Sequence, residues 1–585
     1  MMNSPQSLHF LRPCALSRLA GRKQVYLRFY QRVHQHGLPL QQLQRGLATS
    51  AKDKRVKPDG TSKEDGLEIR SHAVAARIEE LSQANALDYP RIQNNDVVSM
   101  RIPTFREKYR DVSAENPGQE EVVLHGRLQS VRRAGSKLMF LALTGEFENV
   151  QGLCNFRKLE ASGVTLDAFK GLAKLLTRGD LISITGRAVR SNTGELTLEA
   201  TSLPKLLSPS LVPLPFKLEE EDAKIQNRHL DMLVTRETTD VLRLRSYIMR
   251  YMRDWFHEKG FLEFQTPILA ENAGGAVARP FATTSTEFRS KELALRIAPE
   301  LWLKRLVVGG VEKVFEMGPA FRNEGIDLSH NPEFTMCEYY NAYASLQDLI
   351  DQTEELISGL AHHCQDLIST KLMALPAVDL ARYARPYKQV EFLPELQSRL
   401  GFTFPDLSSP KAKESLITLL QDHSIPLPTD AHTSPLPKLL DKLAGDHLEP
   451  DSLSSPLFII HHPAIMSPLS KSFLCPKTNQ LVSARTELFV NGRELANMYE
   501  EENSPFEQRR KFVEQALRNS EEGEEVHVDE SYIQALESGL PPTGGWGCGI
   551  ERLVMLFSGA RRISDTLSFG NLRNVVGLGP GRARR

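Results

Sequence analysis

Residues 313–344 read KVFEMGPAFRNEGIDLSHNPEFTMCEYYNAYA, and this stretch predicts a hairpin of two antiparallel strands. Apolar runs at 314–317 and 333–336 form the strands, and a charged loop separates them. Because successive strand residues alternate between faces, every second side chain of the second strand shares one face. The side chains on that face are Phe334, Met336 and Glu338.

The hairpin carries side chains that suit a nucleotide and a carboxylate. The planar fork of Arg322 can bind a carboxylate and a phosphate at once. The ring of Phe334 can stack on a purine. We therefore expect one cavity, surrounded by Arg322, Glu324, His330, Phe334 and Glu338.

A glycine-rich run, TGGWGCGIERLVMLFSG at 543–559, favours a second part of the same site. Glycines let the backbone approach a ligand closely, although such runs are as often only tight turns. Glu551 and Arg552 then open an apolar helix, where Arg552 is well placed for a triphosphate oxygen.

An acidic hairpin is expected at 484–505, which reads ARTELFVNGRELANMYEEENSP. The Asn491-Gly492 pair is typical of a hairpin turn. Glu487, Glu494 and Glu501 recur at intervals of seven residues. Carboxylates that face one another across a hairpin can hold Mg²⁺, whereas the alternative is a solvated acidic hairpin.

Residues 120–204 are expected to be all-β. Five short apolar runs alternate with turn signals such as Thr144-Gly145 and Asn192-Thr193-Gly194, and a helix at about 165–176 interrupts them. Five strands in so short a segment favour a small barrel of the oligonucleotide-binding (OB) type.

The first 51 residues contain seven Arg or Lys residues and no Asp or Glu. This composition is typical of a mitochondrial transit peptide, and a basic arm that binds RNA is the alternative. Outside this leader the 585-residue chain is acidic, since its totals are 72 basic and 73 acidic residues. Any nucleic acid must then be held by local basic patches and stacking.

Composition excludes several other classes of protein. The 41% hydrophobic and 25% charged residues are ordinary for a globular protein, and no apolar run is long enough for a membrane helix. The six cysteines lack CxxC spacing, which argues against a disulfide framework and a structural zinc site.

Three motifs in order resemble the signatures of class II aminoacyl-tRNA synthetases: a helix, strand and proline ending at Pro267, then Phe321-Arg322-Asn323-Glu324, then Gly547-Cys548-Gly549-Ile550-Glu551-Arg552. The resemblance runs from about residue 66 to the end. The position of the barrel, N-terminal to these motifs, resembles the domain order of the aspartate/asparagine/lysine subgroup. Within it, RIAPELWLKRLVVGG, HNPEFTMCEYY and GGAVARPF resemble the lysyl-tRNA synthetases.

The resemblance implies an α+β protein, with a five-stranded OB-fold barrel before a catalytic domain built on an antiparallel sheet flanked by helices. It implies the layout 1–51 transit peptide, 52–115 helical extension, 116–207 anticodon-binding barrel, 208–228 linker and 229–585 catalytic domain. ATP, Mg²⁺, lysine and tRNA(Lys) are the implied ligands. A homodimer in the mitochondrial matrix, with no membrane partner, is the implied state.

The resemblance also implies a role for each matched residue. Arg322 and Arg552 would be catalytic, and ATP would contact Arg322, Glu324, His330, Phe334, Glu487 and Arg552. Lysine would contact Gly275, Glu300, Glu338, Tyr340, Asn497, Tyr499, Glu501 and Gly547. Glu487 and Glu494 would hold Mg²⁺, and Arg133 and Phe140 would contact the anticodon, although Phe140 could instead be a core residue.

In this reading Glu501 faces the lysine ε-ammonium, and a substrate without that charge leaves Glu501 unpaired. Three alternatives remain. One is an inactive RNA-binding or accessory protein on the same scaffold. The others are aspartate or asparagine specificity, and an enzyme that attaches lysine to a protein.

Overall fold

The computed structural model describes residues 63–92, 97–113, 115–271, 278–521 and 528–576. The expected transit peptide, 1–51, and Gly275 lie outside these residues. The chain divides into two compact units, whose boundary in the sequence lies between Pro213 and Leu214, and each is described by itself.

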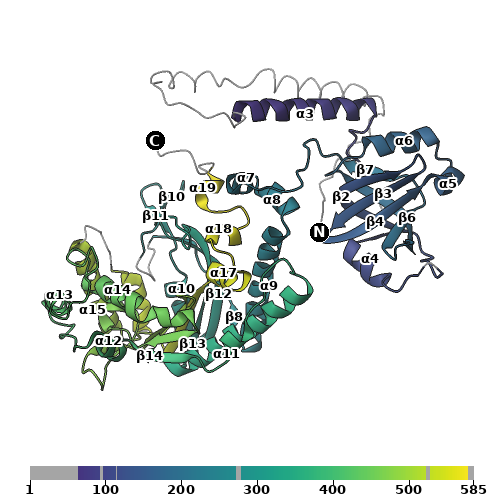
Figure 1. The fold of residues 1–585 in the computed structure, drawn as a ribbon. Helices are drawn as coiled ribbons and strands as arrows, with labels where there is room; N and C mark the ends of the chain where they lie inside the picture. Colours follow the sequence, from purple (N-terminus) through teal and green to yellow (C-terminus); the bar gives the residue numbers. More distant parts are fainter. Residues whose placement is uncertain (1–62, 93–96, 114, 272–277, 522–527, 577–585) are drawn as a thin grey trace, which may run out of the picture. The chain divides into compact units, whose positions relative to one another are not determined.

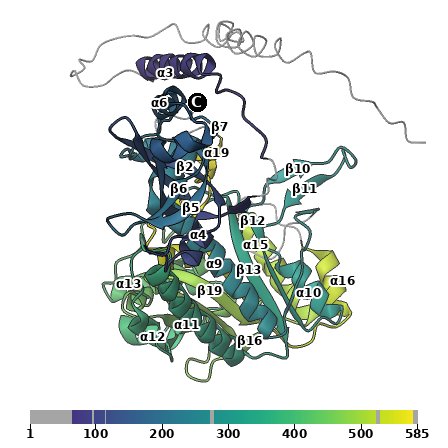
Figure 2. The same cartoon turned by 90° about the vertical axis from the view of Figure 1, so that its right-hand side faces the viewer.

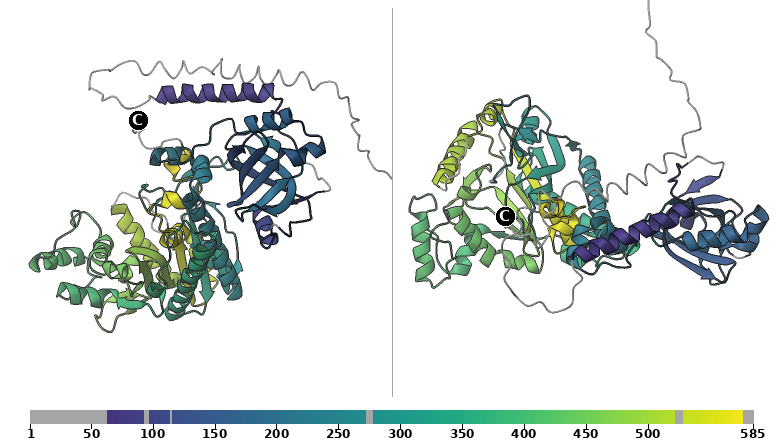
Figure 3. Two further views of the ribbon diagram at one scale, coloured as in Figure 1. Left: turned by 45° about the vertical axis from the view of Figure 1, so that its right-hand side comes forward. Right: turned by 90° about the horizontal axis from the view of Figure 1, so that it is seen from above.

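A closed barrel of five strands forms the first unit (Figures 1 and 3). The strands pair in the order β2–β3–β4–β6–β5, and an additional β2–β5 pairing closes the ring. Their bounds are β2 (Val122–Ala134), β3 (Leu138–Gly145), β4 (Glu148–Asn155), β5 (Leu181–Arg190) and β6 (Leu196–Ala200). The predicted five-stranded barrel is confirmed.

Helix α6 (Leu166–Leu175) confirms the helix expected inside the barrel sequence. The side chain of Thr165 caps it by accepting a hydrogen bond from the amide of Ala168 at 3.2 Å. Helices α4 and α6 lie at opposite ends of the barrel (Figure 2). The other elements of this unit are α3 (Lys63–Gln83), β1 (Val98–Met100), α4 (Ile102–Lys108), α5 (Phe156–Leu159), η1 (Glu160–Ser162) and β7 (Lys205–Ser208).

An eight-stranded sheet forms the centre of the second unit, in the order β14–β15–β18–β19–β20–β13–β12–β8. Only the two outermost pairs, β14–β15 and β12–β8, are parallel. The bounds are β8 (Leu262–Glu263), β12 (Lys313–Phe321), β13 (Glu333–Ala342), β14 (Lys388–Glu391), β15 (Leu457–Ile460), β18 (Arg485–Val490), β19 (Arg493–Glu500) and β20 (Thr543–Gly549). The predicted hairpins form β12–β13 and β18–β19.

Three helices cover one face of this sheet: α9 (Arg236–Glu258), α11 (Leu346–Thr370) and α17 (Ile550–Ser558). Their buried side chains form one core with alternate sheet residues such as Phe315, Tyr339 and Trp546. The helix expected before Pro267 is α9, and its residues Leu244 and Ile248, one turn apart, are fully buried. The expected antiparallel sheet flanked by helices is therefore present.

The opposite face packs on α10 (Glu300–Val308) and α16 (Glu530–Glu537) through a smaller apolar cluster. A third core joins α12, α13 and α14 to the β14–β15 edge. Among the described residues, no helix could cross a membrane. The other elements are α7 (Glu221–Gln226), α8 (Arg228–Val234), β9 (Leu269–Ala270), β10 (Ala282–Thr284), β11 (Glu292–Leu295), η2 (Leu380–Tyr383), α12 (Phe392–Leu400), α13 (Ala412–Asp422), α14 (Leu436–His447), η3 (Glu449–Leu453), η4 (Ala464–Met466), β16 (Ser472–Leu474), β17 (Leu481–Ser483), α15 (Pro505–Glu521), α18 (Ile563–Thr566) and α19 (Leu572–Val575).

A β-bulge on β19 decides which of its side chains face the site. Phe489 lies opposite Glu494, but Leu488 lies opposite Ala496, so one extra residue is inserted on β19. Leu495 and Ala496 consequently both pack in the core. Beyond the bulge the alternation is reversed, which turns Asn497 and Tyr499 to the face that carries Glu487.

The edge strand expected to close at Pro267 is shorter than predicted. β8 contains only Leu262 and Glu263. Beyond it, the amide of Phe264 still donates to the carbonyl of Phe315. The amide and hydroxyl of Thr266 then donate to the side-chain carboxylate of Glu316 on β12, at 3.1 and 2.6 Å, instead of to a backbone carbonyl. The guanidinium of Arg296 holds the same carboxylate at 2.6 Å.

Candidate active site

Strand β20 forms the floor of the candidate site and lies between β13 and β19. Gly547 pairs with Glu338 on one side and Asn497 on the other, and Gly545 pairs with Tyr340 and Tyr499. Because glycine has no side chain, polar side chains such as Glu338, Tyr340 and Glu501 lie close over β20 at these positions. A Cβ atom on Gly545 would lie 1.9 Å from Oε1 of Glu501, so only glycine fits there.

Three carboxylates with one ammonium group among them line the candidate site. Glu300, Glu338 and Glu501 are all at least 95% buried, and Lys304 is fully buried. The ammonium of Lys304 forms ion pairs with Glu300, at 2.6 Å, and with Glu501. Glu501 therefore already has a cationic partner in the protein, contrary to the expectation that only a substrate would supply one.

Tyrosine hydroxyls hold two of these carboxylates. Tyr499 donates to Oε1 of Glu300 at 2.7 Å, and Tyr340 donates to Glu338 at 3.1 Å. Oε1 of Glu300 also accepts the bond from Lys304. The structure thus brings together all the predicted lysine-binding residues that it describes.

Burial raises the pKa of Glu338 to about 8, and the negative charge of Glu300 acts in the same direction. Burial also raises the pKa of Glu501, even though the adjacent Lys304 opposes the shift. Burial by itself would lower the pKa of Lys304, but Glu300 and Glu501 outweigh it and raise the pKa. Glu338 and Glu501 therefore resist ionisation more than exposed carboxyls do, because burial and a neighbouring negative charge both oppose it.

The predicted nucleotide residues lie along the adjoining end of the β12–β13 hairpin. The guanidinium of Arg322 lies 5.2 Å from the centre of the Phe334 ring. Among the described residues, no carboxylate pairs with Arg322, which suits a group that awaits an anionic ligand. Arg552 approaches Nε2 of His330 at 3.4 Å, and Glu324 remains exposed.

The predicted metal ligands each have a protein partner. Glu487 pairs with Arg485 and, at 3.1 Å, with His462. Burial would raise its pKa, but the charges of Arg485 and His462 prevail and lower the pKa to about 2. Glu494 pairs with Arg552 at 3.2 Å, while its recessed position and the charge of Glu487 raise its pKa.

Two carboxylates without a full protein cage suit Mg²⁺, which usually completes its shell with phosphates and water. The carboxylates of Glu487 and Glu494 repel each other, and a divalent cation between them would relieve this repulsion. The described residues contain no cluster of three or more acidic, His or Cys side chains suited to a metal. The donor set therefore fits a metal held jointly with a phosphate ligand.

Three residues of the site were missed by the sequence analysis: Lys304, His462 and Arg485. Gly545 belongs to the glycine run that was predicted at 543–559. Two of the three missed residues had a readable signal. Lys304 follows Glu300 by four residues on a helix, and Arg485 precedes Glu487 by two on a strand. Arg485 also donates to Asn497 at 3.0 Å, and so links the predicted metal ligand Glu487 to a predicted lysine-binding residue.

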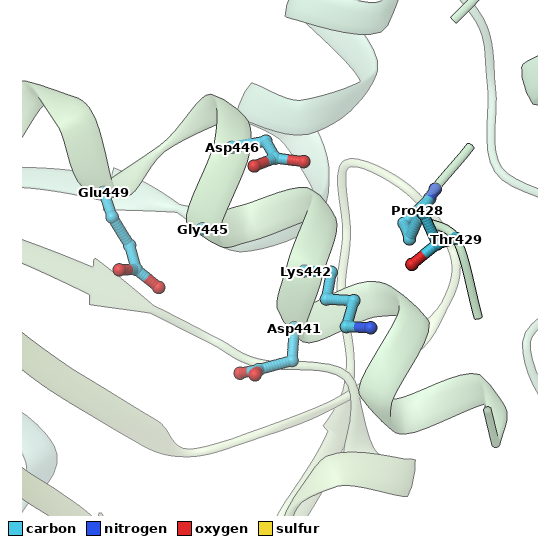
Figure 4. A pocket seen from close by; sticks show the side chains of 7 residues that line it. All are labelled: Pro428, Thr429, Asp441, Lys442, Gly445, Asp446 and Glu449. Atoms are coloured by element: carbon cyan, nitrogen blue, oxygen red, sulfur yellow. The ribbon is translucent and has the colours of Figure 1, made fainter. Parts of the chain in front are cut away.

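A separate acidic hollow of about 480 Å³ lies on α14 (Figure 4). Asp441, Asp446 and Glu449 line it, and none of them belongs to the predicted site. Burial raises the pKa of Glu449 to about 7, with further contributions from the charges of Asp441 and Glu487. The hollow thus places further carboxyl groups near Glu487 and Glu494.

On the barrel, Phe140 is half-buried while its neighbour Met139 occupies the core. The exposed guanidinium of Arg132, its partner across the β2–β3 pair, lies 4.5 Å from the ring centre. Arg133 instead donates to the carbonyl of Ala173 at 2.7 Å. A half-buried ring beside a cation suits base stacking better than a core role.

Comparison with known proteins identifies the fold family. The family model described as tRNA synthetases class II (D, K and N) matches residues 220–573, which is more than half of the chain. The chain belongs to this family. The model of an OB-fold nucleic acid binding domain matches residues 122–206 of this synthetase, which is the closed barrel.

The synthetase has curated relatives of nearly its own length. The mitochondrial lysine–tRNA ligase of Schizosaccharomyces pombe is 40% identical, and the match covers 83% of this chain and 91% of the relative. The probable cytoplasmic lysine–tRNA ligase of Encephalitozoon cuniculi is 36% identical over 81% of this chain and 92% of its own. The lysine–tRNA ligase of Deinococcus radiodurans is 36% identical, with 86% and 93% covered.

Replacing Gly545 with alanine should raise the KM for the amino acid by about 10- to 100-fold, because the new methyl group displaces the Glu501 carboxylate. Steady-state kinetics of adenylate formation measure this effect. Gly445→Ala is the matched control, since its Cβ would meet only ordinary contacts. An unchanged KM in a folded Gly545→Ala protein would show that Glu501 does not shape the pocket.

Proposed function

We propose that the synthetase is a lysine–tRNA ligase, which activates lysine with ATP and transfers it to tRNA(Lys). The pocket itself supports this choice. Its three buried carboxylates suit a substrate with two ammonium groups, whereas a pocket for aspartate would need a cation in their place. The relatives named above carry the same activity in their names.

In the first step an oxygen of the lysine carboxylate attacks the α-phosphorus of ATP, and pyrophosphate leaves. In the second step a hydroxyl of the 3′-terminal ribose of the tRNA attacks the carbonyl of the adenylate, and AMP leaves. Neither step needs a nucleophilic side chain. Catalysis by the protein then consists of alignment and stabilisation of charge.

Arg322 would bind the lysine carboxylate and the α-phosphate, and Arg552 would bind the far end of ATP. Each such preorganised contact contributes about 3 kcal/mol to the transition state when water is excluded. Glu324, His330 and Phe334 would surround the adenine. Glu300, with Gly275, would take the α-amino group.

Glu487 and Glu494 would hold Mg²⁺ jointly with the phosphates of ATP. The ion supplies charge neutralisation between those phosphates. Arg552 pairs with Glu494 in this structure, so it would exchange that carboxylate for a phosphate when ATP binds. Arg485 and His462 would keep Glu487 ionised and oriented.

Residues 116–207 would bind the anticodon through Phe140 and Arg133, while 229–585 would carry both chemical steps.

A homodimer is supported by exposed apolar residues on the short edge strand β8 and in the segment that follows it, namely Leu262, Ile268 and Leu269. Residues 1–51 would direct the protein to the mitochondrial matrix. Fluorescence microscopy of residues 1–51 fused to a reporter tests that address.

Amino-acid-dependent ATP–pyrophosphate exchange should occur with lysine alone among the twenty amino acids. The buried acids require a second ammonium group, so neutral and acidic amino acids bind poorly. The Arg322→Ala variant should lose at least about 100-fold in exchange rate. Folded protein that exchanges with no amino acid would instead favour the inactive accessory protein.

Replacing Phe140 with alanine should raise the KM for tRNA by about 10-fold, because one stacked base contributes about 1–3 kcal/mol. Lysine-dependent exchange, which needs no tRNA, should not change. Lys170→Ala on α6 controls for loss of surface charge, since this side chain is exposed. If the KM for tRNA is the same in Phe140→Ala and the wild type, Phe140 does not contact the tRNA and only packs in the barrel.

A further inference from the structure

The lysine pocket contains a lysine of the protein itself. Lys304 is fully buried on α10, with Glu300 one turn before it and Glu501 reached from the end of β19. The rings of Tyr340, Tyr499 and Tyr532 surround its ammonium group at 5.7 to 5.9 Å. A charge removed so completely from water is retained only where its partners are fixed.

Counting the charges gives this ammonium group a role beyond packing. The pocket holds the three carboxylates of Glu300, Glu338 and Glu501 and the single cation of Lys304. Two negative charges then lack a partner, and lysine brings two ammonium groups. Arg322 separately binds the carboxylate of the substrate lysine, so the pocket with its substrate has no net charge.

We propose that Lys304 is a specificity-determining positioning residue, which fixes Glu501 and sets the pocket's charge to match an amino acid with two ammonium groups. This inference rests on the proposed lysine specificity and names the residue that tunes it. An amino acid with one ammonium group leaves one carboxylate without a cation, so that carboxyl must stay protonated.

The groups that face Lys304 explain why binding should depend on pH. Glu300 lies on its own helix, Glu338 and Tyr340 on β13, Tyr499 and Glu501 on β19 and just beyond it, and Tyr532 on α16. Other cations near this group of residues are Arg322, Arg305 and Arg485, and Arg485 is paired with Glu487. Burial raises the pKa of all three tyrosines, so they stay neutral and the carboxyls titrate.

The sign of the pH dependence follows from the raised pKa of Glu338, about 8, in the empty pocket. Below that pH a proton occupies the acid set and must leave when lysine binds, so affinity for lysine should rise with pH towards 8. Removing the charge of Lys304 should raise the pKa of the acids further and move the rise to higher pH.

The test compares Lys304→Met with Lys304→Arg in the full-length protein, using the pH profile of kcat/KM for lysine in pyrophosphate exchange. The ascending limb should move up by at least about one pH unit in Lys304→Met and stay in place in Lys304→Arg. A limb that keeps its position in Lys304→Met while only its height falls would overturn the proposal.

A wild-type measurement serves if Lys304→Met does not fold. Calorimetric titration with lysine at pH 7, in two buffers of different ionisation enthalpy, should show proton release on binding, and no release would overturn the charge matching. Failure of the proposed function would be recognised separately. If the wild-type protein shows no lysine-dependent exchange, the proposed function is wrong, and the role of Lys304 is then not the reason.

Discussion

The ion pairs of Lys304 with Glu300 and Glu501 are the constraint on which the candidate site depends. Buried carboxylates without partners would cost several kcal/mol each, and the protein answers with one fixed cation and tyrosine hydroxyls. These partners do not neutralise all of the negative charge of the three carboxylates. Since the remaining negative charge can be met by a substrate with two ammonium groups, the proposed choice of amino acid would follow from the same cluster.

Two backbone features place that cluster. The bulge on β19 reverses the alternation of the strand, so that Asn497 and Tyr499 share a face with Glu487. The glycines of β20 then leave room between this wall and β13, most strictly at Gly545. Arg485 contacts both Glu487 and Asn497, which lie opposite each other on β18 and β19, and so couples the expected metal position to the expected lysine position.

Much of this could be read from the sequence, because hydrophobic periodicity and turn residues are local signals. The hairpin at 313–344, the Asn491-Gly492 turn and the five barrel strands were predicted and are present. The bulge could not be predicted, since simple alternation from the turn puts Ala496, and not Asn497, on the side of Glu487. Partners fixed by tertiary contact, such as His462, were also beyond the sequence, and the edge strand near Pro267 was predicted too long.

The central claim is that the protein's own lysine and the substrate share one set of carboxylates. A high-resolution structure of the synthetase with bound lysine tests it most directly. Lys304 should stay bonded to Glu300 and Glu501 while the two ammonium groups of the ligand contact the remaining carboxylate oxygens. A complex in which Lys304 has left these acids, or in which lysine binds away from Glu501, would contradict it.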